Sequence, residues 1–361
     1  MVAGCGVRGF ILAAGRGVRL GPLGERLPKP LWPLGGLPLI FFALHKLRLA
    51  GVREVGINLH HGAEAVRAAV GERPLGLEAR YFFEAEILGT AGGLKNAEGF
   101  LCERGEPFFV LNADAPCGAD LNGALDHHLR GGFLATLVLR QSPEAGRYGL
   151  LAADEGGRLR RFLRARAPGA AQGLLTEAMF TGLSVLSPAV LDRIPGGRPC
   201  GISEEIYPPM IAEGVPLGAV LTTAPWADVG TPERFLAAHE DLLAGRFLPE
   251  FPWPGEDHVL VAGAPVEWGE GRIEPPVLVS SEARLGRGAS AGPFSVLMSG
   301  ATLLPGASVS RSVVFPGARV AAGARLDRCI VGPGASAASA GEEVRRSVFL
   351  DGEAGSVPFG D

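Results

Sequence analysis

The residues best suited to chemistry lie in a glycine-containing segment that follows the first apolar run of the chain. Gly15 and Gly17 carry no side chains, so their backbone N–H groups are open to an anion such as a phosphate. Arg19 and Lys29 add two cations. On their own the glycines indicate only a tight turn, because they match neither G-x-G-x-x-G nor a loop ending in G-K-[ST]. Glycine, arginine and lysine in this order predict a site for a phosphate-bearing ligand.

Two aspartates in predicted loops are candidates for a metal site. Asp114 follows an apolar run, and Asp228 precedes a helix predicted to begin near Thr231. Mg²⁺ is usually held by one or two carboxylates together with substrate phosphates, so this pair could share one ion. Each aspartate could instead cap a helix or a turn.

These residues need a sheet to position them. Residues 1 to about 245 alternate between apolar runs and segments of helical spacing, which predicts an α/β fold with a mostly parallel sheet covered on both faces. The predicted strands are 7–12, 55–59, 79–83, 108–112 and 133–140, and the predicted helices are 39–50, 63–70 and 231–245. Ligands bind at the carboxyl ends of such strands, so site residues are expected just after Leu12, Leu59, Phe83 and Leu111.

The last third of the chain follows a different pattern. The pair Gly-Ala recurs at 288, 300, 306, 317, 323 and 334, which is a six-residue period with two single deletions. An aliphatic residue follows most pairs at a fixed distance, as a β-solenoid of about three coils requires and a flexible tail does not. We therefore predict a catalytic domain at 1–245, a proline-rich linker at 246–256 and a solenoid at 257–361, with a frayed end at 350–361.

The composition of the 361 residues excludes several classes of function. With 47% hydrophobic residues the chain can fold, and its length indicates two domains. A net charge of −4 offers no basic field for nucleic acid or an anionic membrane. No apolar run reaches the roughly 20 residues of a membrane span, and the start does not match a secretory signal. Five cysteines without C-x-x-C spacing indicate reduced thiols, so we expect a cytoplasmic protein with no nucleic-acid or membrane partner.

The glycine-containing segment resembles the signature of the sugar-1-phosphate nucleotidyltransferases. That signature, L-A-A-G-x-G-x-R-L-x-P-L followed by P-K-P-L-x-P, is matched here at 12–23 and 28–33. Further matches follow in the family's order at 58–61, 84–93, 111–114 and 226–231. The chain looks most like the mannose-1-phosphate guanylyltransferase branch, which carries a C-terminal left-handed β-helix of hexapeptide repeats.

The resemblance implies a Rossmann-like nucleotidyltransferase domain and a particular reaction. A sugar-1-phosphate oxygen attacks the α-phosphorus of a nucleoside triphosphate, and pyrophosphate leaves. It implies that Arg19 and Lys29 are catalytic cations on the phosphates, and that Asp114 and Asp228 bind Mg²⁺. The nucleotide-binding positions implied by the match are Leu12, Ala13, Ala14, Gly15, Gly17, Glu84, Gly89 and Thr90.

Glu84 is the residue expected to select the base. It lies five residues before Gly89, in the segment with which the family recognises the base. A carboxylate only accepts hydrogen bonds, and guanine offers two adjacent donors where uracil offers one, so Glu84 favours guanine. A surface glutamate beside a glycine turn is the alternative. Asn58 could equally cap the end of its strand or contact a ligand, and the histidines at 60–61 and 127–128 are predicted to lie at the surface or at a helix entry.

The sugar side departs from the family pattern. Many relatives carry F-x-E-K-P where this chain reads Phe-Leu-Arg-Ala-Arg at 162–166, so Arg164 or Arg166 would have to supply the cation. Gly149 matches a sugar-contacting glycine, and Thr181 replaces an asparagine of the family. Gly149 and Thr181 are therefore the sugar-binding candidates, and the identity of the sugar cannot be read.

Three functions remain open at this stage. The first makes GDP-mannose from GTP and mannose-1-phosphate, and the second uses UTP or another triphosphate with another hexose-1-phosphate. The third is a catalytically silent subunit that binds nucleotide sugar, against which the intact cations and aspartates argue. An acyltransferase role for the solenoid is rejected, because the last histidine, His258, precedes the repeats. Solenoid strand edges are expected to pack together in a homo-oligomer.

Overall fold

The computed structural model describes residues 6–143, 145–169, 171–247, 257–353 and 355–360. By contacts the chain forms two compact units, of which the first comprises 1–16, 28–31 and 39–226 and the second 17–27, 32–38 and 227–361. The second unit therefore contains part of the glycine-containing segment as well as the repeats. Most of the predicted linker, at 248–256, lies outside the described residues, and the boundary at 245 stays a prediction.

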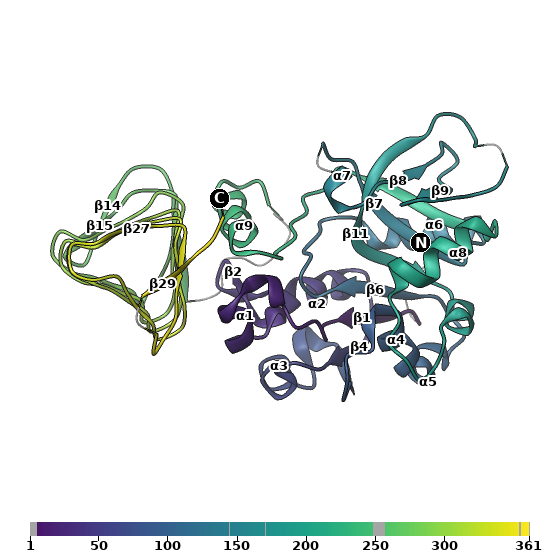
Figure 1. The fold of residues 1–361 in the computed structure, drawn as a ribbon, viewed down its shortest axis with the longest axis horizontal. Helices are drawn as coiled ribbons and strands as arrows, with labels where there is room; N and C mark the ends of the chain where they lie inside the picture. The colour runs from purple at the N-terminus through teal and green to yellow at the C-terminus, as the bar shows by residue number, and fades with distance from the viewer. Residues whose placement is uncertain (1–5, 144, 170, 248–256, 354, 361) are drawn as a thin grey trace. The chain divides into compact units, whose positions relative to one another are not determined.

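The first unit is built on one sheet whose centre is parallel (Figure 1). Strand β1 lies between β4 and β6, and β5 extends the sheet beyond β4, all four running in the same direction. Beyond β6, strand β11 pairs antiparallel with both β6 and β7. The strands are β1 (Arg8–Leu12), β4 (Glu54–Leu59), β5 (Glu78–Phe83), β6 (Phe108–Asn112), β7 (Ala135–Arg140), β8 (Leu151–Ala153), β9 (Leu159–Phe162), β10 (Ala165–Arg166), β11 (Thr176–Leu186) and β12 (Leu217–Thr222).

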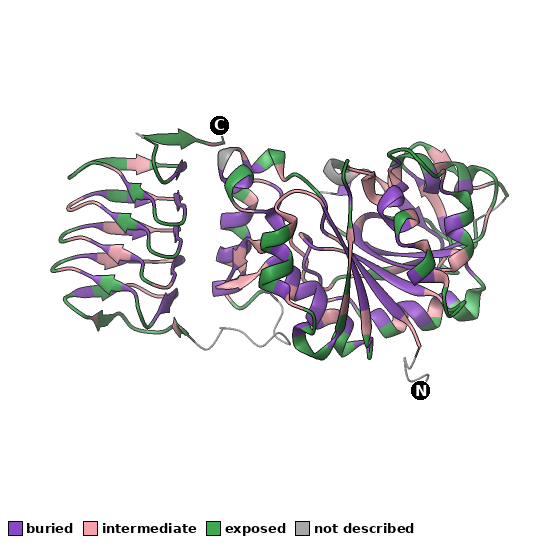
Figure 2. Ribbon diagram, turned by 90° about the horizontal axis from the view of Figure 1, so that it is seen from below, coloured by how far each residue is buried: buried purple, intermediate pink, exposed green. Residues whose placement is uncertain are grey.

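Helices cover both faces of this sheet, as the alternating pattern predicts. Apolar residues of α2, α3 and α6 pack on one face, and those of α4, α5 and α8 on the other. Figure 2 shows the strands between them as buried. These helices are α2 (Leu39–Leu49), α3 (Ala63–Val70), α4 (Gly89–Asn96), α5 (Glu98–Cys102), α6 (Leu121–Gly131) and α8 (Tyr207–Ala212), with shorter turns at α7 (Ala145–Tyr148), η3 (Pro74–Gly76), η4 (Pro188–Arg193) and η5 (Ile202–Ile206).

The second unit contains the predicted solenoid, whose three sides appear as three sheets (Figure 1). Parallel pairing joins Val296 to Val313, Ile330 and Val348 in successive coils, which are three six-residue sides long or one residue shorter. Its strands are β13 (His258–Val261), β14 (Val266–Trp268), β15 (Gly271–Ile273), β16 (Val277–Ser280), β17 (Arg284–Leu285), β18 (Ser290–Ala291), β19 (Ser295–Leu297), β20 (Thr302–Leu303), β21 (Ser308–Ser310), β22 (Val313–Val314), β23 (Arg319–Val320), β24 (Arg325–Asp327), β25 (Ile330–Val331), β26 (Ser336–Ala337), β27 (Glu343–Arg345), β28 (Ser347–Phe349) and β29 (Ser356–Pro358).

The Gly-Ala pairs form the corners of the coils. Every one of the six glycines has a φ between 67° and 71°, a left-handed conformation that a Cβ disfavours. The alanines that follow point inward and are at most 1% exposed, and the aliphatic residues two positions further on are buried as well. The repeat was therefore interpreted correctly. The frayed end was wrong for 356–358, because β29 pairs antiparallel with β28 and covers the edge of the last coil.

Aromatic side chains pack the non-solenoid part of the second unit against the coils. Phe235, in α9 (Pro232–Leu243), lies edge-on to Trp32, with ring centroids 4.8 Å apart. Phe315 of the solenoid lies 6.1 Å from Phe235 and 6.4 Å from Trp32. The unit's other elements are η1 (Val18–Leu20), α1 (Pro22–Arg26), β2 (Pro33–Leu34) and β3 (Leu37–Pro38), while η2 (Lys29–Leu31) belongs to the first unit.

Two absences bear on the sequence analysis. Among the described residues, no helix is both long and apolar enough to cross a bilayer. Cys102, Cys117, Cys200 and Cys329 form no disulfide within the part of the chain that the structure describes.

His128 is buried late in α6, so the prediction that it lies at the surface or at a helix entry is wrong. It lies on the face of α6 that packs against the sheet and is 2% exposed. Its Nδ1 is 3.0 Å from Thr136 Oγ1, and its Nε2 is 3.0 Å from Ser187 Oγ. Burial, with a smaller contribution from His127, lowers the pKa of His128 from 6.5 to about 4.

This burial makes the stability of the fold depend on pH. The pKa of His128 is lower in the fold than in the unfolded chain, so its contribution is complete above pH 6.5 and is lost as the pH falls towards 4. His128→Gln should therefore flatten the fall in unfolding free energy across that window, by up to about 1.4 kcal/mol per pH unit. Urea unfolding at several pH values measures this, and equal slopes for both proteins would contradict it.

Candidate active site

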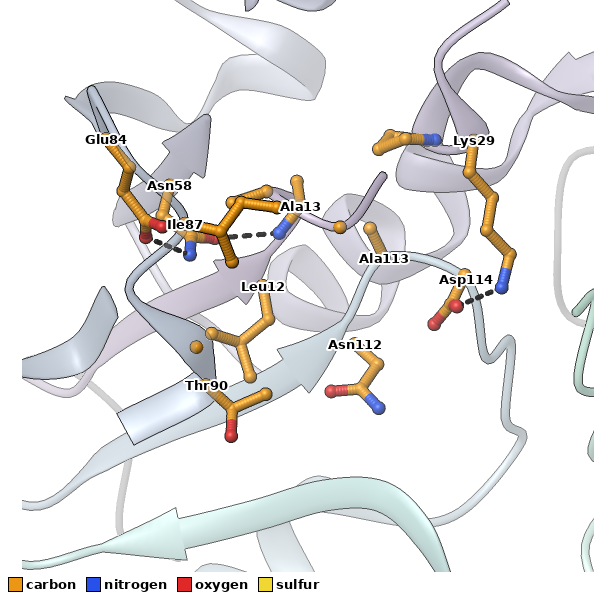
Figure 3. A pocket seen from close by; sticks show the side chains of 14 residues that line it. Leu12, Ala13, Lys29, Asn58, Glu84, Ile87, Thr90, Asn112, Ala113 and Asp114 are labelled. Carbon is orange, nitrogen blue, oxygen red and sulfur yellow. Dashed lines mark hydrogen bonds and ion pairs between the residues drawn. The ribbon is translucent and has the colours of Figure 1, made fainter. Parts of the chain in front are cut away.

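A pocket of about 210 Å³ opens where four strands of the first unit end (Figure 3). Its walls come from the segments that follow β1, β4, β5 and β6, which is the edge where the sequence analysis expects the site. The lining residues are Leu12, Ala13, Ala14, Gly15, Lys29, Pro30, Asn58, Glu84, Ile87, Gly89, Thr90, Asn112, Ala113 and Asp114. All the predicted nucleotide-binding positions except Gly17 are among them, and Gly17 belongs to the second unit.

Lys29 supplies the cation of this pocket. It begins the single turn η2 and is only 7% exposed, so its ammonium group is directed and not freely solvated. Its Nζ donates to a carboxylate oxygen of Asp114, which follows β6 (Figure 3). A buried ammonium group needs such a partner, and an arriving phosphate could share it.

Asn58 and Glu84 lie together on the opposite side of the pocket from Lys29 (Figure 3). Asn58 is the penultimate residue of β4 and donates from Nδ2 to Glu84 Oε1 at 2.7 Å. The backbone N–H of Ala13 donates to Asn58 Oδ1, also at 2.7 Å. Asn58 lines the pocket, and both groups of its amide are engaged with Ala13 and Glu84.

The first turn of α4 is held by a segment far along the chain. The carbonyl oxygen of Cys200 accepts from the N–H groups of Ala91 and Gly92 at 3.0 and 3.1 Å. Gly89 has a φ of 74°, and a Cβ there would lie 2.6 Å from the same oxygen. Thr90 Oγ1 accepts from the N–H of Ile202 at 2.8 Å. Gly89 is required by this close approach of backbone.

The remaining charged candidates belong to the second unit. Asp228 forms an ion pair with Arg234 in the first turn of α9. A Cβ on Gly230 would lie 2.8 Å from Asp228 Oδ1 and 3.1 Å from Arg19 Nη2. Arg19 and Asp228 therefore flank one glycine, and the absence of a side chain at Gly230 leaves room for both.

The two sugar candidates do not line the pocket. Thr181 is 1% exposed, and its hydroxyl donates to the carbonyl of Val138 at 2.8 Å within the sheet. Gly149 has a φ of 91° and faces Leu163. Arg164 and Arg166, the possible substitutes for the family's lysine, are exposed.

Ile87 and Asn112 also line the pocket, and neither is among the residues predicted from the sequence. Asn112 is the last residue of β6, and a Cβ on Gly182 would lie 2.7 Å from its Nδ2. The place of Asn112 at the end of a predicted strand is the sequence signal that could have identified it. Ile87 lies in a loop, and no sequence pattern marks it.

The oxygen atoms of the pocket suit a hard divalent cation whose remaining ligands are water and phosphate oxygens. Among the described residues no three His, Cys, Asp or Glu side chains gather as a metal site. Asp114 offers one partly exposed carboxylate in the pocket. Such a site fits Mg²⁺, which takes few protein ligands and completes its shell with water and phosphate oxygens.

Comparisons with known proteins show which family the chain belongs to. A family model described as nucleotidyl transferase matches residues 8–245. A UTP–glucose-1-phosphate uridylyltransferase of Synechocystis sp. is 30% identical over 85% of this chain and 82% of its own length. A mannose-1-phosphate guanylyltransferase of Mycobacterium tuberculosis is 31% identical over 84% and 81%. The structure of HddC from Yersinia pseudotuberculosis matches with a TM-score of 0.55 at 22% identity, over 66% of this chain and 100% of that one, which supports the fold alone.

The chain belongs to the nucleotidyl transferase family, and within it to the sugar-1-phosphate nucleotidyltransferases. The resemblance of the signature is thereby confirmed. One relative is named a mannose-1-phosphate guanylyltransferase and another a UTP–glucose-1-phosphate uridylyltransferase, so the family alone leaves the substrates open.

Gly89→Ala tests the close approach at the base of α4. A Cβ at a φ of 74° and 2.6 Å from the Cys200 carbonyl should displace the loop. We expect a loss of about 1–3 kcal/mol in unfolding free energy and weaker nucleotide binding. Gly99→Ala in α5 is the matched control, because a Cβ there meets nothing within 4 Å and its φ is ordinary. The control should be neutral or slightly stabilised, and equal effects of the two substitutions would contradict the assignment.

Proposed function

We propose that this nucleotidyltransferase joins GTP and mannose-1-phosphate to give GDP-mannose and pyrophosphate in the cytoplasm. The observation that carries the proposal is the pocket in which Lys29 and Asp114 meet the glycine-containing turn at the end of β1. This arrangement offers one cation, one carboxylate and exposed backbone to a phosphate chain. The Mycobacterium tuberculosis relative, named for this pair of substrates, supports the choice.

The chain's own residues would act by positioning and charge compensation. A phosphate oxygen of the sugar-1-phosphate forms a bond to the α-phosphorus while the bond from that phosphorus to the β-phosphate oxygen breaks. Lys29 would stabilise the negative charge on the phosphoryl oxygens, and Gly15 lets the chain approach them closely. Asp114 would hold Mg²⁺, which supplies positive charge to the phosphates when bound.

Arg19 and Asp228 are assigned to the same reaction from the sequence signature. Arg19 would bind the leaving pyrophosphate, and Asp228 would be a second ligand of the metal. In the second unit the two side chains flank Gly230, and Asp228 already carries an ion pair with Arg234. That pairing keeps the carboxylate in a defined place before the metal arrives.

From the sequence, guanine is favoured by Glu84 as an acceptor-only side chain. Glu84 lines the pocket, but both of its oxygens already accept within the protein, from Asn58 Nδ2 and from the N–H of Leu88. The proposal of guanine therefore rests on the relative named a mannose-1-phosphate guanylyltransferase. Gly149 and Thr181 remain the proposed sugar-side positions. Thr181 could act there only through its backbone, because its hydroxyl is engaged with Val138.

A silent nucleotide-sugar-binding subunit is the second candidate function. It is favoured by the loss of the family's glutamate and lysine at 162–166, where Arg164 and Arg166 are exposed. In either case we propose a dimer or higher homo-oligomer formed through the solenoid.

A pyrophosphate-release assay tests these proposals. The purified chain is mixed with Mg²⁺ and each of four nucleoside triphosphates, crossed with mannose-, glucose- and other hexose-1-phosphates. GTP with mannose-1-phosphate should give the highest kcat/KM. Preference for another pair would move the enzyme to that substrate, and no release from any pair would identify the silent subunit.

Asp114→Asn should abolish Mg²⁺-dependent release in a chain that still folds, with a lower melting temperature because the buried ammonium group of Lys29 loses its charged partner. Lys29→Ala should lower kcat by about 10²–10³. Asp126→Asn, an exposed change on α6, is the control. Normal turnover of the Asp114 variant would remove this residue from the metal site.

A further inference from the structure

A buried chain of hydrogen bonds joins the ends of three parallel strands in the first unit (Figure 3). It begins at the N–H of Ala13, passes through Asn58 to Glu84, and returns to backbone at Leu88, whose N–H donates to Glu84 Oε2 at 2.9 Å. Asn58 is 2% exposed and Glu84 is 5% exposed. Water is therefore a poor substitute for any of these bonds.

The chemistry of the two ends fixes the order of groups between them. A backbone N–H can only donate, so Asn58 must turn its oxygen to Ala13 and its NH₂ to Glu84. Glu84 must then accept at both oxygens, from Asn58 on one side and from Leu88 on the other. One amide and one carboxylate satisfy this chain, whereas two amides or two carboxylates do not.

Gly93 of α4 packs closely against the side chains of Asn58 and Glu84. A Cβ on Gly93 would lie 2.6 Å from Asn58 Nδ2 and 2.8 Å from Glu84 Oε1. The helix backbone thus approaches both side chains closely, and neither can swing away from the other on that side. This contact explains Gly93, the second glycine of the sequence Thr-Ala-Gly-Gly at 90–93.

We propose that Asn58 and Glu84 are positioning residues that set the spacing between the phosphate-binding turn at Ala13 and the base-binding loop at Leu88. A nucleotide has its phosphates at one end and its base at the other, so a fixed spacing of the two segments selects its bound conformation. This inference rests on the proposed nucleotide-binding role of the pocket and deepens it. In this role the carboxylate of Glu84 fixes the position of the loop at Leu88. If Glu84 instead recognised the base directly, its carboxylate would be a ligand of guanine.

The test exchanges the two functional groups. In Glu84→Gln, the N–H of Leu88 still needs an acceptor, so the amide oxygen of the glutamine must face it. The NH₂ of the glutamine then faces the NH₂ of Asn58, and one hydrogen bond is lost. In the double variant Asn58→Asp with Glu84→Gln, Ala13 donates to the aspartate, the glutamine donates to the aspartate, and Leu88 donates to the glutamine. All three bonds and the single negative charge return, displaced by one residue.

We expect Glu84→Gln to raise the Kd for a fluorescent mant-GTP and the KM for GTP by about 10-fold, the scale of one unsatisfied buried group. The double variant should recover both to within about threefold, together with the melting temperature. The KM for the sugar-1-phosphate should change little. Val66→Ala, a buried change on α3 away from the pocket, is the matched control that lowers stability without raising the Kd for mant-GTP.

Other outcomes overturn the proposal in distinguishable ways. If the double variant regains stability but not affinity for mant-GTP, Glu84 reads the base directly and the positioning role is wrong. If Glu84→Gln binds mant-GTP normally, the spacing is set by something else. If the unaltered chain binds mant-GTP but releases no pyrophosphate from any pair, only the proposed catalytic function fails, and the exchange still decides the role of the two residues.

Discussion

The parallel pairing of β1 with its two neighbours is the constraint on which the site depends. Leu12 pairs with Asn58 on one side and with Asn112 on the other. Because these strands run in one direction, segments far apart in sequence end at the same edge of the sheet. A register shift of one residue would turn Asn58 to the opposite face of the sheet and remove it from the pocket. The buried register therefore positions the chemistry before any ligand arrives.

The solenoid of the second unit is stabilised in a different way. Its coils turn at glycines with positive φ, and inward alanines and aliphatic residues stack from coil to coil. One corner lacks glycine and instead holds Arg311, Arg328 and Arg346 at φ values of 46° to 53°. A left-handed arginine costs about 1–2 kcal/mol, which the pairing and burial of the adjoining strands must offset. The solenoid thus tolerates local strain because each coil is held by its neighbours.

The elements could be predicted wherever the signal was local. The run at 108–112 and the Gly-Ala repeat indicate their own structure, because apolar residues are consecutive in the first and recur at a short interval in the second. The bond between Asn58 and Glu84, and the capping of α4 by Cys200, depend on contacts between distant segments, so neither was visible. His128 was misplaced because two adjacent histidines look polar, although only one faces the sheet. Gly89 was assigned to the nucleotide, and the carbonyl of Cys200 supplies an additional reason for it.

The occupied start of α4 has a consequence for how negative charge is received. A helix N-terminus often binds phosphate through its unpaired N–H groups, but here Ala91 and Gly92 already donate to the carbonyl of Cys200. The dipole of this helix is therefore partly compensated by the protein itself. An anion would therefore find its partners at the other end of the pocket, at Lys29 and at the turn that contains Gly15. Added salt would weaken a contact with the Lys29 ammonium group more than a contact made by oriented backbone.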